Sequence, residues 1–431
     1  MFLEKEGKLI YSYDGETVCI EAWGKDALRV RATKNRSFTG RDWALEAKDA
    51  HAGEVEIFED PSAKGGAFAN MYEGTDTSYG KITNGKLHAV IDSGSVITFY
   101  HEDGRVLLKE HFRRLRDEES MPLNIMGREY SNGVGDNFRI VARFVARKGE
   151  KIFGMGQYQQ HELDLKGCML ELAQRNSQVS VPFYLSSIGY GFLWNNPGVG
   201  QVMFANNGTE WVTESGKEID YLVIAGDTPA EIEENYMTLT GKPPMMPEYG
   251  MGFWQCKLRY WNQEQLLSVA RKYKELGVPL DVIVVDFFHW TKQGEFKFDP
   301  KYWPDVPGMC RELKEMGIQV VVSVWPTVDI YSENFEEMKE KGYLVRTEHG
   351  VPLTMLCGGN EVFFDATNPD ARTYVWEKNQ EKLLRSGCKT LLAGCGRAGI
   401  QRLRFQELPL SARKRTGGRK YLSEILSESV L

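Results

Sequence analysis

The chain has 431 residues, which is enough for two or three domains with cores of their own. Hydrophobic residues make up 42% and charged residues 26%, a composition that excludes a disordered chain. The formal net charge of -7 disfavours a protein built to bind nucleic acid, because an acidic surface repels phosphate.

The seven cysteines are an odd number, widely spaced, with no C-x-x-C pair and no histidine at ligand spacing. We therefore expect reduced thiols in a cytoplasmic protein, with no metal and no cofactor. Charged residues begin at Glu4, so the N-terminus has no apolar signal region. No uncharged stretch of the sequence is long enough to cross a bilayer. We expect neither export by a visible signal nor a membrane partner.

From residue 9 to about residue 236, short β-rich runs are separated by turn dipeptides. Each of three dipeptides is a signal for a two-residue hairpin loop. They are Asp14-Gly15 between 9–13 and 17–23, Asn84-Gly85 between 80–83 and 86–91, and Asp103-Gly104 between 96–100 and 105–108. This pattern predicts an antiparallel β-sandwich, and we assign it to residues 1–246.

A proline cluster at residues 243–247 resists both helix and central strand, so we place a domain boundary before Pro247. Beyond it, apolar strand-length runs alternate with helical periodicity. The predicted strands cover 250–255, 280–286 and 319–325, with a fourth from Cys388, and the predicted helices cover 263–276, 308–316, 333–341 and 370–386.

Such alternation indicates a parallel sheet, either a (β/α)8 barrel or a doubly wound sheet. No G-x-G-x-x-G follows any strand, which disfavours the dinucleotide-binding fold. A full barrel needs about 250 residues, whereas only 185 residues run from Pro247 to Leu431. We therefore expect an incomplete barrel in residues 247–390.

Residues at the carboxyl ends of barrel strands line the active site, and here those ends are aromatic and acidic. Asp286 follows the second strand, where its carboxylate could accept hydrogen bonds from sugar hydroxyls while Phe288 or Trp290 packs an apolar sugar face. The alternative is a loop carboxylate that caps the next segment beside buried rings. Trp325 ends the third strand at the same level, although alone it reads more naturally as a core residue.

Two other features of the sequence are given no part in the candidate site. Asn368 followed by Pro369 is typical of an N-cap and a first helical position, so this motif is interpreted as structural. His289 and His161 stand alone without a partner at metal spacing, and neither is assigned a role.

Several separated segments, in the right order, resemble glycoside hydrolase family 31, the retaining α-glucosidases and α-xylosidases. The resemblance spans about residues 1–390. The matching segments are 153–157 (F-G-M-G-Q), 181–183 (V-P-F), 189–197 (G-Y-G-F-L-W-N-N-P), 252–254 (G-F-W), 286–288 (D-F-F), 298–300 (F-D-P), 325–326 (W-P), 341–345 (K-G-Y-L-V) and 365–369 (D-A-T-N-P).

The resemblance implies a galactose-mutarotase-like β-sandwich followed by a (β/α)8 barrel that removes α-linked sugars from non-reducing ends. It also implies that Asp286 binds a hydroxyl of the terminal sugar, with Phe288 and Trp325 at matching wall positions. Together with Trp290, these are the predicted substrate-binding residues. Xylose and glucose stay open as the sugar.

The sequence departs from the family at the fourth strand, where the family carries its nucleophile in a pattern like K-T-F-W-L-D-x-x-E-P-E-Y. Here Lys389-Thr390 is followed by L-L-A-G-C-G-R, without a carboxylate. Residues 1–390 hold 45 Lys+Arg and 57 Asp+Glu, whereas residues 391–431 hold 8 and 3, so the net charge changes from -12 to +5.

We interpret this change as a one-nucleotide frame error after Thr390, which makes residues 391–431 an out-of-frame tail. Codons for residues 391–394 can be chosen that read F-W-L-D one base downstream, and the same offset permits E-P-E-Y across residues 397–401. The rival interpretation is a basic arm that binds nucleic acid, or a solvated tail, but this segment lacks interleaved aromatic residues and follows a half-built barrel.

The predicted function is therefore that of a retaining α-glycosidase whose nucleophile and acid/base are missing from this chain, with no catalytic residue assigned. We expect this chain to be inactive and poorly soluble. The alternative is a non-catalytic carbohydrate-binding protein that uses Asp286 and the nearby rings.

Overall fold

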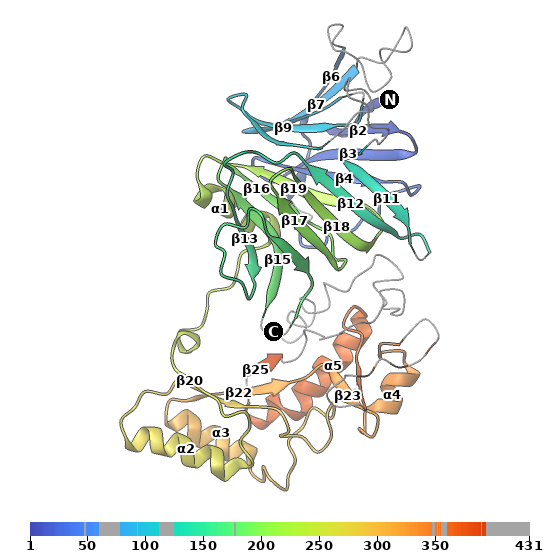
Figure 1. The fold of residues 1–431 in the computed structure, drawn as a ribbon. Helices are drawn as coiled ribbons and strands as arrows, with labels where there is room; N and C mark the ends of the chain where they lie inside the picture. The colour runs from blue at the N-terminus through green and yellow to red at the C-terminus, as the bar shows by residue number, and fades with distance from the viewer. Residues whose placement is uncertain are drawn as a thin grey trace. The chain divides into compact units, whose positions relative to one another are not determined.

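The structure is a computed structural model that describes most of the chain (Figure 1). The described residues are 1–46, 49–59, 78–92, 94–111, 125–133, 135–175, 178–346, 350, 352, 354, 360–388 and 390–393. They form two compact units that divide between Pro243 and Pro244, apart from a short segment around residue 175 that groups with the second unit.

The N-terminal unit is built from three β-sheets whose paired strands run antiparallel. The largest sheet has the order β1-β2-β3-β4-β19-β16-β15-β13, with β5 beside β3. Its strands are β1 (Phe2–Lys5), β2 (Lys8–Tyr13), β3 (Glu16–Trp23), β4 (Ala27–Thr33), β5 (Ala50–His51), β13 (Ile152–Gln157), β15 (Val179–Ser186), β16 (Tyr190–Trp194) and β19 (Ile219–Ala225).

The other two sheets have the orders β10-β9-β8-β7-β6 and β11-β12-β18-β17-β14. The first consists of β6 (Glu54–Glu59), β7 (Ser78–Asn84), β8 (Leu87–Ile91), β9 (Ile97–His101) and β10 (Val106–Lys109). The second consists of β11 (Arg128–Asn132), β12 (Phe138–Phe144), β14 (Met169–Leu172), β17 (Gly200–Ala205) and β18 (Gly208–Gly216). Helix α1 (Pro229–Thr240) ends the unit.

Alternate residues along these strands face a shared core. In β8 the first, third and fifth residues are buried, as the two-residue period of a half-buried strand requires. Ile20 of β3, Phe99 of β9 and Trp211 of β18 belong to one buried cluster, so all three sheets contribute to the same core. The predicted antiparallel β-sandwich is confirmed.

The three predicted hairpins form, but their loops differ in length. Tyr13 pairs with Glu16, so Asp14-Gly15 is a two-residue loop as predicted. At the third hairpin the pairing resumes only at Val106, opposite Tyr100, so Asp103-Gly104 lies inside a longer loop. The expectation of a two-residue loop was wrong there.

The second hairpin turns one residue later than expected. Asn84 still pairs with Leu87, which leaves Gly85-Lys86 as the loop. The reason is that the Asn84 side chain is engaged elsewhere: its Nδ2 donates to the carbonyls of Gly24 and Ala27, each at 2.8 Å. Gly85, with φ of +55°, then takes the left-handed conformation that the turn needs.

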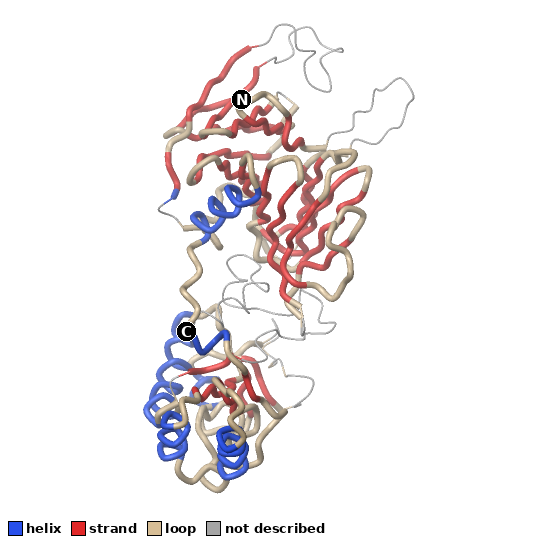
Figure 2. The backbone as a smooth tube through the Cα atoms, turned by 90° about the vertical axis from the view of Figure 1, so that its left-hand side faces the viewer, coloured by secondary structure: helices blue, strands red, loops and turns tan. Residues whose placement is uncertain are grey.

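The C-terminal unit contains a four-stranded parallel sheet of order β20-β21-β22-β25 (Figure 1). Its strands are β20 (Trp254–Gln255), β21 (Val282–Val285), β22 (Gln319–Val324) and β25 (Thr390–Ala393). The helices are α2 (Gln263–Glu275), α3 (Val306–Glu315), α4 (Phe335–Glu340) and α5 (Pro369–Lys382), with short 3-10 turns η2 (Glu248–Met251) and η3 (Leu384–Ser386). Figure 2 shows these helices around the strands of the unit.

The apolar faces of these helices pack on the sheet, as the alternation in the sequence predicts. Leu266 of α2, Met309 of α3 and Val322 of β22 lie in one buried cluster. The N-cap prediction for α5 is also confirmed, since the Asn368 side chain accepts a hydrogen bond from the Asp370 amide at 3.0 Å.

Two details of this unit differ from the sequence prediction. Residues 250–253 do not belong to the first strand, because the chain after Pro247 turns into η2, where the Gly250 amide donates to the Pro247 carbonyl at 2.8 Å. A small antiparallel pair, β23 (Thr327–Asp329) with β24 (Glu361–Phe363), was missed.

The fourth predicted strand is present as β25, paired in parallel with β22. Residues 394–431 lie outside the described residues, so the frame-error hypothesis and the missing carboxylates stay predictions. None of the described helices combines the length and the apolar character that a membrane crossing requires.

Candidate functional site

The candidate site lies where β21 and β22 end. These strands are parallel neighbours, with Val285 opposite Val322, so the segments that follow them emerge at the same edge of the sheet. Asp286 follows β21 directly, and Trp325 follows β22 directly.

The Asp286 carboxylate is half-buried and accepts two hydrogen bonds. Its Oδ1 accepts a hydrogen bond from the Phe287 amide at 2.7 Å, and its Oδ2 accepts one from the Cys256 thiol at 3.4 Å. Burial, followed by the contact with Asp286, raises the pKa of the Cys256 thiol to about 11. The thiol therefore stays protonated as a donor, and the carboxylate, which has roughly four acceptor positions, keeps capacity for a ligand hydroxyl.

The structure brings the three predicted aromatic residues together around one further ring. Trp325 stacks on Phe287 at 5.4 Å between ring centroids, with 10° between the planes. Trp290 meets Trp325 edge-on at 6.1 Å and lies 6.2 Å from Phe288. Phe288, Trp290, Trp325 and Phe287 thus form a continuous aromatic wall beside the strand ends, and its offset and edge contacts are favourable ring geometries.

Phe288 is the outermost ring of this wall. It is 53% exposed, and its backbone has φ of +62°, a conformation that bulky residues rarely adopt. A large apolar side chain that is held outward at a strained position is a feature of binding sites.

An arginine connects Phe288 to the loop that follows β20. The Arg259 guanidinium lies 5.0 Å from the centroid of the Phe288 ring and 3.6 Å from that of Trp261. Trp261 is itself 59% exposed. Sequence reasoning missed Arg259, Trp261, Phe287 and Cys256, although the position of residues 256–261 just after a predicted strand was an available signal.

His289 lies under the loop that follows β21 and is shielded from solvent. It is buried, and its ring Nδ1 donates to the Asp286 carbonyl at 3.1 Å. Burial lowers the pKa of His289 to about 4, so the imidazole is neutral at physiological pH. The described residues contain no group of three or more His, Cys, Asp or Glu side chains that could hold a metal ion.

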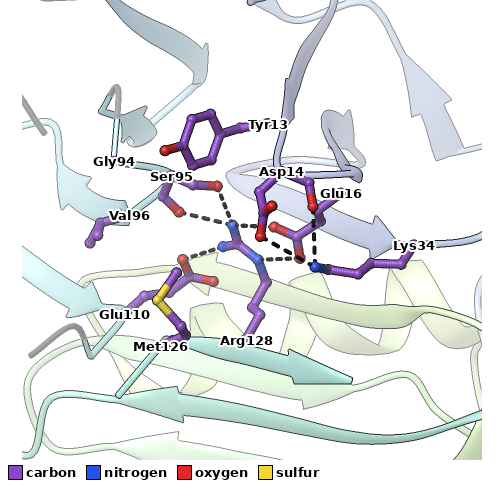
Figure 3. Close-up of a pocket in the computed structure, with 11 residues that line it drawn as sticks. Tyr13, Asp14, Glu16, Lys34, Gly94, Ser95, Val96, Glu110, Met126 and Arg128 are labelled. Carbon is purple, nitrogen blue, oxygen red and sulfur yellow. Dashed lines mark hydrogen bonds and ion pairs between the residues drawn. The ribbon is translucent and has the colours of Figure 1, made fainter. Parts of the chain in front are cut away.

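A hollow with a volume of about 80 Å³ lies in the N-terminal unit around Arg128 (Figure 3). Arg128 donates to both oxygens of Glu16, at 3.0 Å each, and to Glu110. Tyr130 donates to Glu16 at 2.8 Å, and Tyr221 donates to Glu110 at 3.2 Å. Because these groups are hydrogen-bonded to one another, they form a structural ion network around the hollow, and this network joins strands of different sheets.

Residues 243–396 match the family described as "Glycosyl hydrolases family 31 TIM-barrel domain". The chain is 42% identical to the uncharacterized family 31 glucosidase ORF2 of Pseudescherichia vulneris over 398 residues, which are 90% of this chain and 72% of that protein. The chain belongs to glycoside hydrolase family 31.

Solved structures and other relatives agree with this membership. The chain resembles the family 31 α-xylosidase from a soil metagenome, solved in complex with xylose, with a TM-score of 0.90 and 42% identity, over 100% of this chain and 62% of that one. It is 29% identical to α-xylosidase A of Aspergillus niger over 87% of this chain and 51% of that protein. This family 31 chain therefore spans between about half and three quarters of the length of these relatives.

Proposed function

We propose that the C-terminal unit carries the terminal-sugar site of a retaining α-glycosidase that acts on α-xylosides or α-glucosides. The observation that carries the proposal is the Asp286 carboxylate at the strand edge beside the wall of Phe287, Phe288, Trp290 and Trp325. A carboxylate that accepts from vicinal hydroxyls, next to rings that cover an apolar sugar face, is the usual chemistry of pyranose recognition.

The sugar class rests on the relatives. The soil-metagenome enzyme is an α-xylosidase in complex with xylose, and the Aspergillus niger relative is an α-xylosidase. The Pseudescherichia vulneris relative is described as a glucosidase. We therefore propose xylose as the preferred terminal sugar and glucose as the second.

Hydrolysis with retention needs a nucleophile and an acid/base whose carboxyl groups stand about 5–5.5 Å apart. Asp286 alone cannot serve as such a pair, and residues 391–397, where the family pattern places the nucleophile, contain no carboxylate. We propose that the chain with this sequence does not cleave the glycoside.

The first experiment compares two chains on p-nitrophenyl α-xyloside and α-glucoside. The chain with the present sequence is expected to release no nitrophenol. A chain expressed from the source DNA with the frame shifted by one base after Thr390 is expected to release it, and the Asp286→Asn variant of that shifted chain is expected to lose most of the rate. Turnover by the present chain would overturn the proposed inactivity.

A second candidate function, non-catalytic carbohydrate binding, is favoured by the same wall because binding requires no acid/base pair. Calorimetry of the present chain with xylose and glucose is expected to show saturable heat that Asp286→Asn abolishes. Glu336→Gln, at an exposed position of α4, removes the same charge at the surface and is the matched control, expected to bind normally. Absence of heat for the unmodified chain would eliminate this candidate.

A further inference from the structure

Two thiols meet inside the C-terminal unit, away from the candidate sugar site. Cys310 lies on α3, and Cys388 lies two residues before β25. Their sulfur atoms are 3.2 Å apart although 78 residues separate them in the sequence. Both are free thiols, and among the described cysteines they are the pair whose sulfur atoms are hydrogen-bonded to each other.

The local backbone brings the two cysteines together. The chain turns at Gly387, whose φ of +103° lies in the region that favours glycine. A Cβ atom at Gly387 would lie 3.2 Å from the Cβ of Cys310, so the turn passes directly against α3. Cys388 is fully buried in the same apolar cluster as Leu313 and Val322. The two sulfur atoms are therefore held near each other by packed elements on both sides.

The two thiols differ in reactivity. The hydrogen bond from Cys388 lowers the pKa of Cys310, whereas the same contact and burial raise the pKa of Cys388. Cys310 is also only partly buried. It is therefore the sulfur that ionises first and that a small reagent reaches first, since the thiolate is the nucleophile in thiol chemistry.

We propose that Cys310 and Cys388 are an oxidisable pair that closes to a disulfide when the chain meets a small disulfide such as oxidised glutathione. The Cys310 thiolate attacks one sulfur of the small disulfide, forms a mixed disulfide and expels one thiolate. The Cys388 thiol then loses its proton, attacks the Cys310 sulfur and expels the second thiolate. Two protein thiols are oxidised to one S–S bond, and the small disulfide is reduced to two thiols.

The bond would join α3 to the start of β25 with little movement, because the sulfur atoms need to approach from 3.2 Å to about 2 Å. Among the described strands, β25 pairs with β22 alone and lies at the edge of the sheet. The disulfide would therefore give this edge strand a second, covalent attachment. Closing a loop of this length restricts the unfolded chain, so the oxidised unit should melt at a higher temperature.

The test titrates the whole chain with oxidised glutathione, traps remaining thiols by alkylation and maps all seven cysteines by peptide mass spectrometry. The expected product is a crosslink between the peptides that contain Cys310 and Cys388, reversed by dithiothreitol. The oxidised chain is expected to show an upward shift of several degrees in the melting transition of the C-terminal unit. Trapping can be done directly in cell extract, so it does not depend on purification.

Two variants separate the steps. Cys388→Ala is expected to stop at a persistent glutathione adduct on Cys310, whereas Cys310→Ala is expected to leave Cys388 unmodified. Cys168→Ala, a partly buried thiol of the other unit, is the matched control and should leave the crosslink unchanged. Crosslinks spread over many cysteine pairs, or full alkylation of both thiols after oxidation, would overturn the proposal. Because the inference does not involve the sugar site, its outcome is independent of the proposed function.

Discussion

His289 anchors the loop after β21 as a buried, neutral imidazole. It is 2% exposed, and the proton on Nδ1 is used by the Asp286 carbonyl. In the unfolded chain the imidazole takes up a proton near its ordinary pKa of 6.5, whereas burial lowers the pKa in the folded chain to about 4. Between these values the unfolded state binds more protons, so stability is full above the window and falls as the pH falls through it.

The first prediction follows from this difference. Lowering the pH from 7 to about 5 should cost the C-terminal unit about 2 kcal/mol through His289 alone. His289→Gln, which has no titrating group, should lose that part of the pH dependence. Unfolding at both pH values can be followed by hydrogen exchange of peptides that cover β21 and β22.

Exposed His161 provides the control, because His161→Gln removes an imidazole that is not buried. This variant should keep the full pH dependence of the unmodified chain. Equal losses of stability in the unmodified chain and in His289→Gln would show that His289 does not account for the effect.

At the same scale, the sequence was sufficient to select Asp286, Phe288, Trp290 and Trp325 as neighbours at one strand edge, since position after a strand determines that. The same signal covered Cys256 and Arg259, but it did not show what they contact. A thiol that donates to a carboxylate on the neighbouring strand end, and a guanidinium between two rings, depend on how the loops after those strands fold. That Asp286 and the rings beside it contact a sugar remains the proposal that the binding experiment tests.

At the scale of elements, helix α5 begins as the sequence predicts because its signal is entirely local. The Asn368 side chain satisfies the Asp370 amide, and Pro369 occupies a position whose amide would lack a partner. Asn368→Ala should lower the stability of the C-terminal unit by about 1 kcal/mol, and Asn368→Asp should retain nearly all of it because aspartate caps equally well. Denaturant unfolding of the three chains measures both values, and an Asp variant as unstable as the Ala variant would contradict the cap.

Elements whose signal is not local were missed or displaced. Asn84 belongs to β7 because its amide donates to carbonyls of Gly24 and Ala27, some 60 residues away, and no turn rule includes such a partner. The β23–β24 pair joins residues more than 30 positions apart through three residues on each side, too few to show a strand period. Local patterns therefore predicted elements with a local signal, such as α5, whereas tertiary partners decided the bounds of β7 and the pairing of β23 with β24.

At the scale of the whole molecule, the N-terminal unit has a core of its own and an internal ion network. Residues 1–243 expressed alone should therefore fold to a β-rich protein with one cooperative unfolding transition, and should be more soluble than the full chain. In that fragment, Arg128→Ala would leave the buried carboxylate of Glu110 without its cation and should cost about 3 kcal/mol.

Arg139→Ala, which removes an exposed pair with Glu214 at 3.5 Å, is the matched control and should cost less than about 1 kcal/mol. Circular dichroism during denaturant unfolding of the fragment and its two variants gives these free energies. A fragment that aggregates, or that unfolds without a cooperative transition, would show that the N-terminal unit depends on the rest of the chain. Similar losses for Arg128→Ala and Arg139→Ala would instead show that the buried network contributes no more than a surface pair.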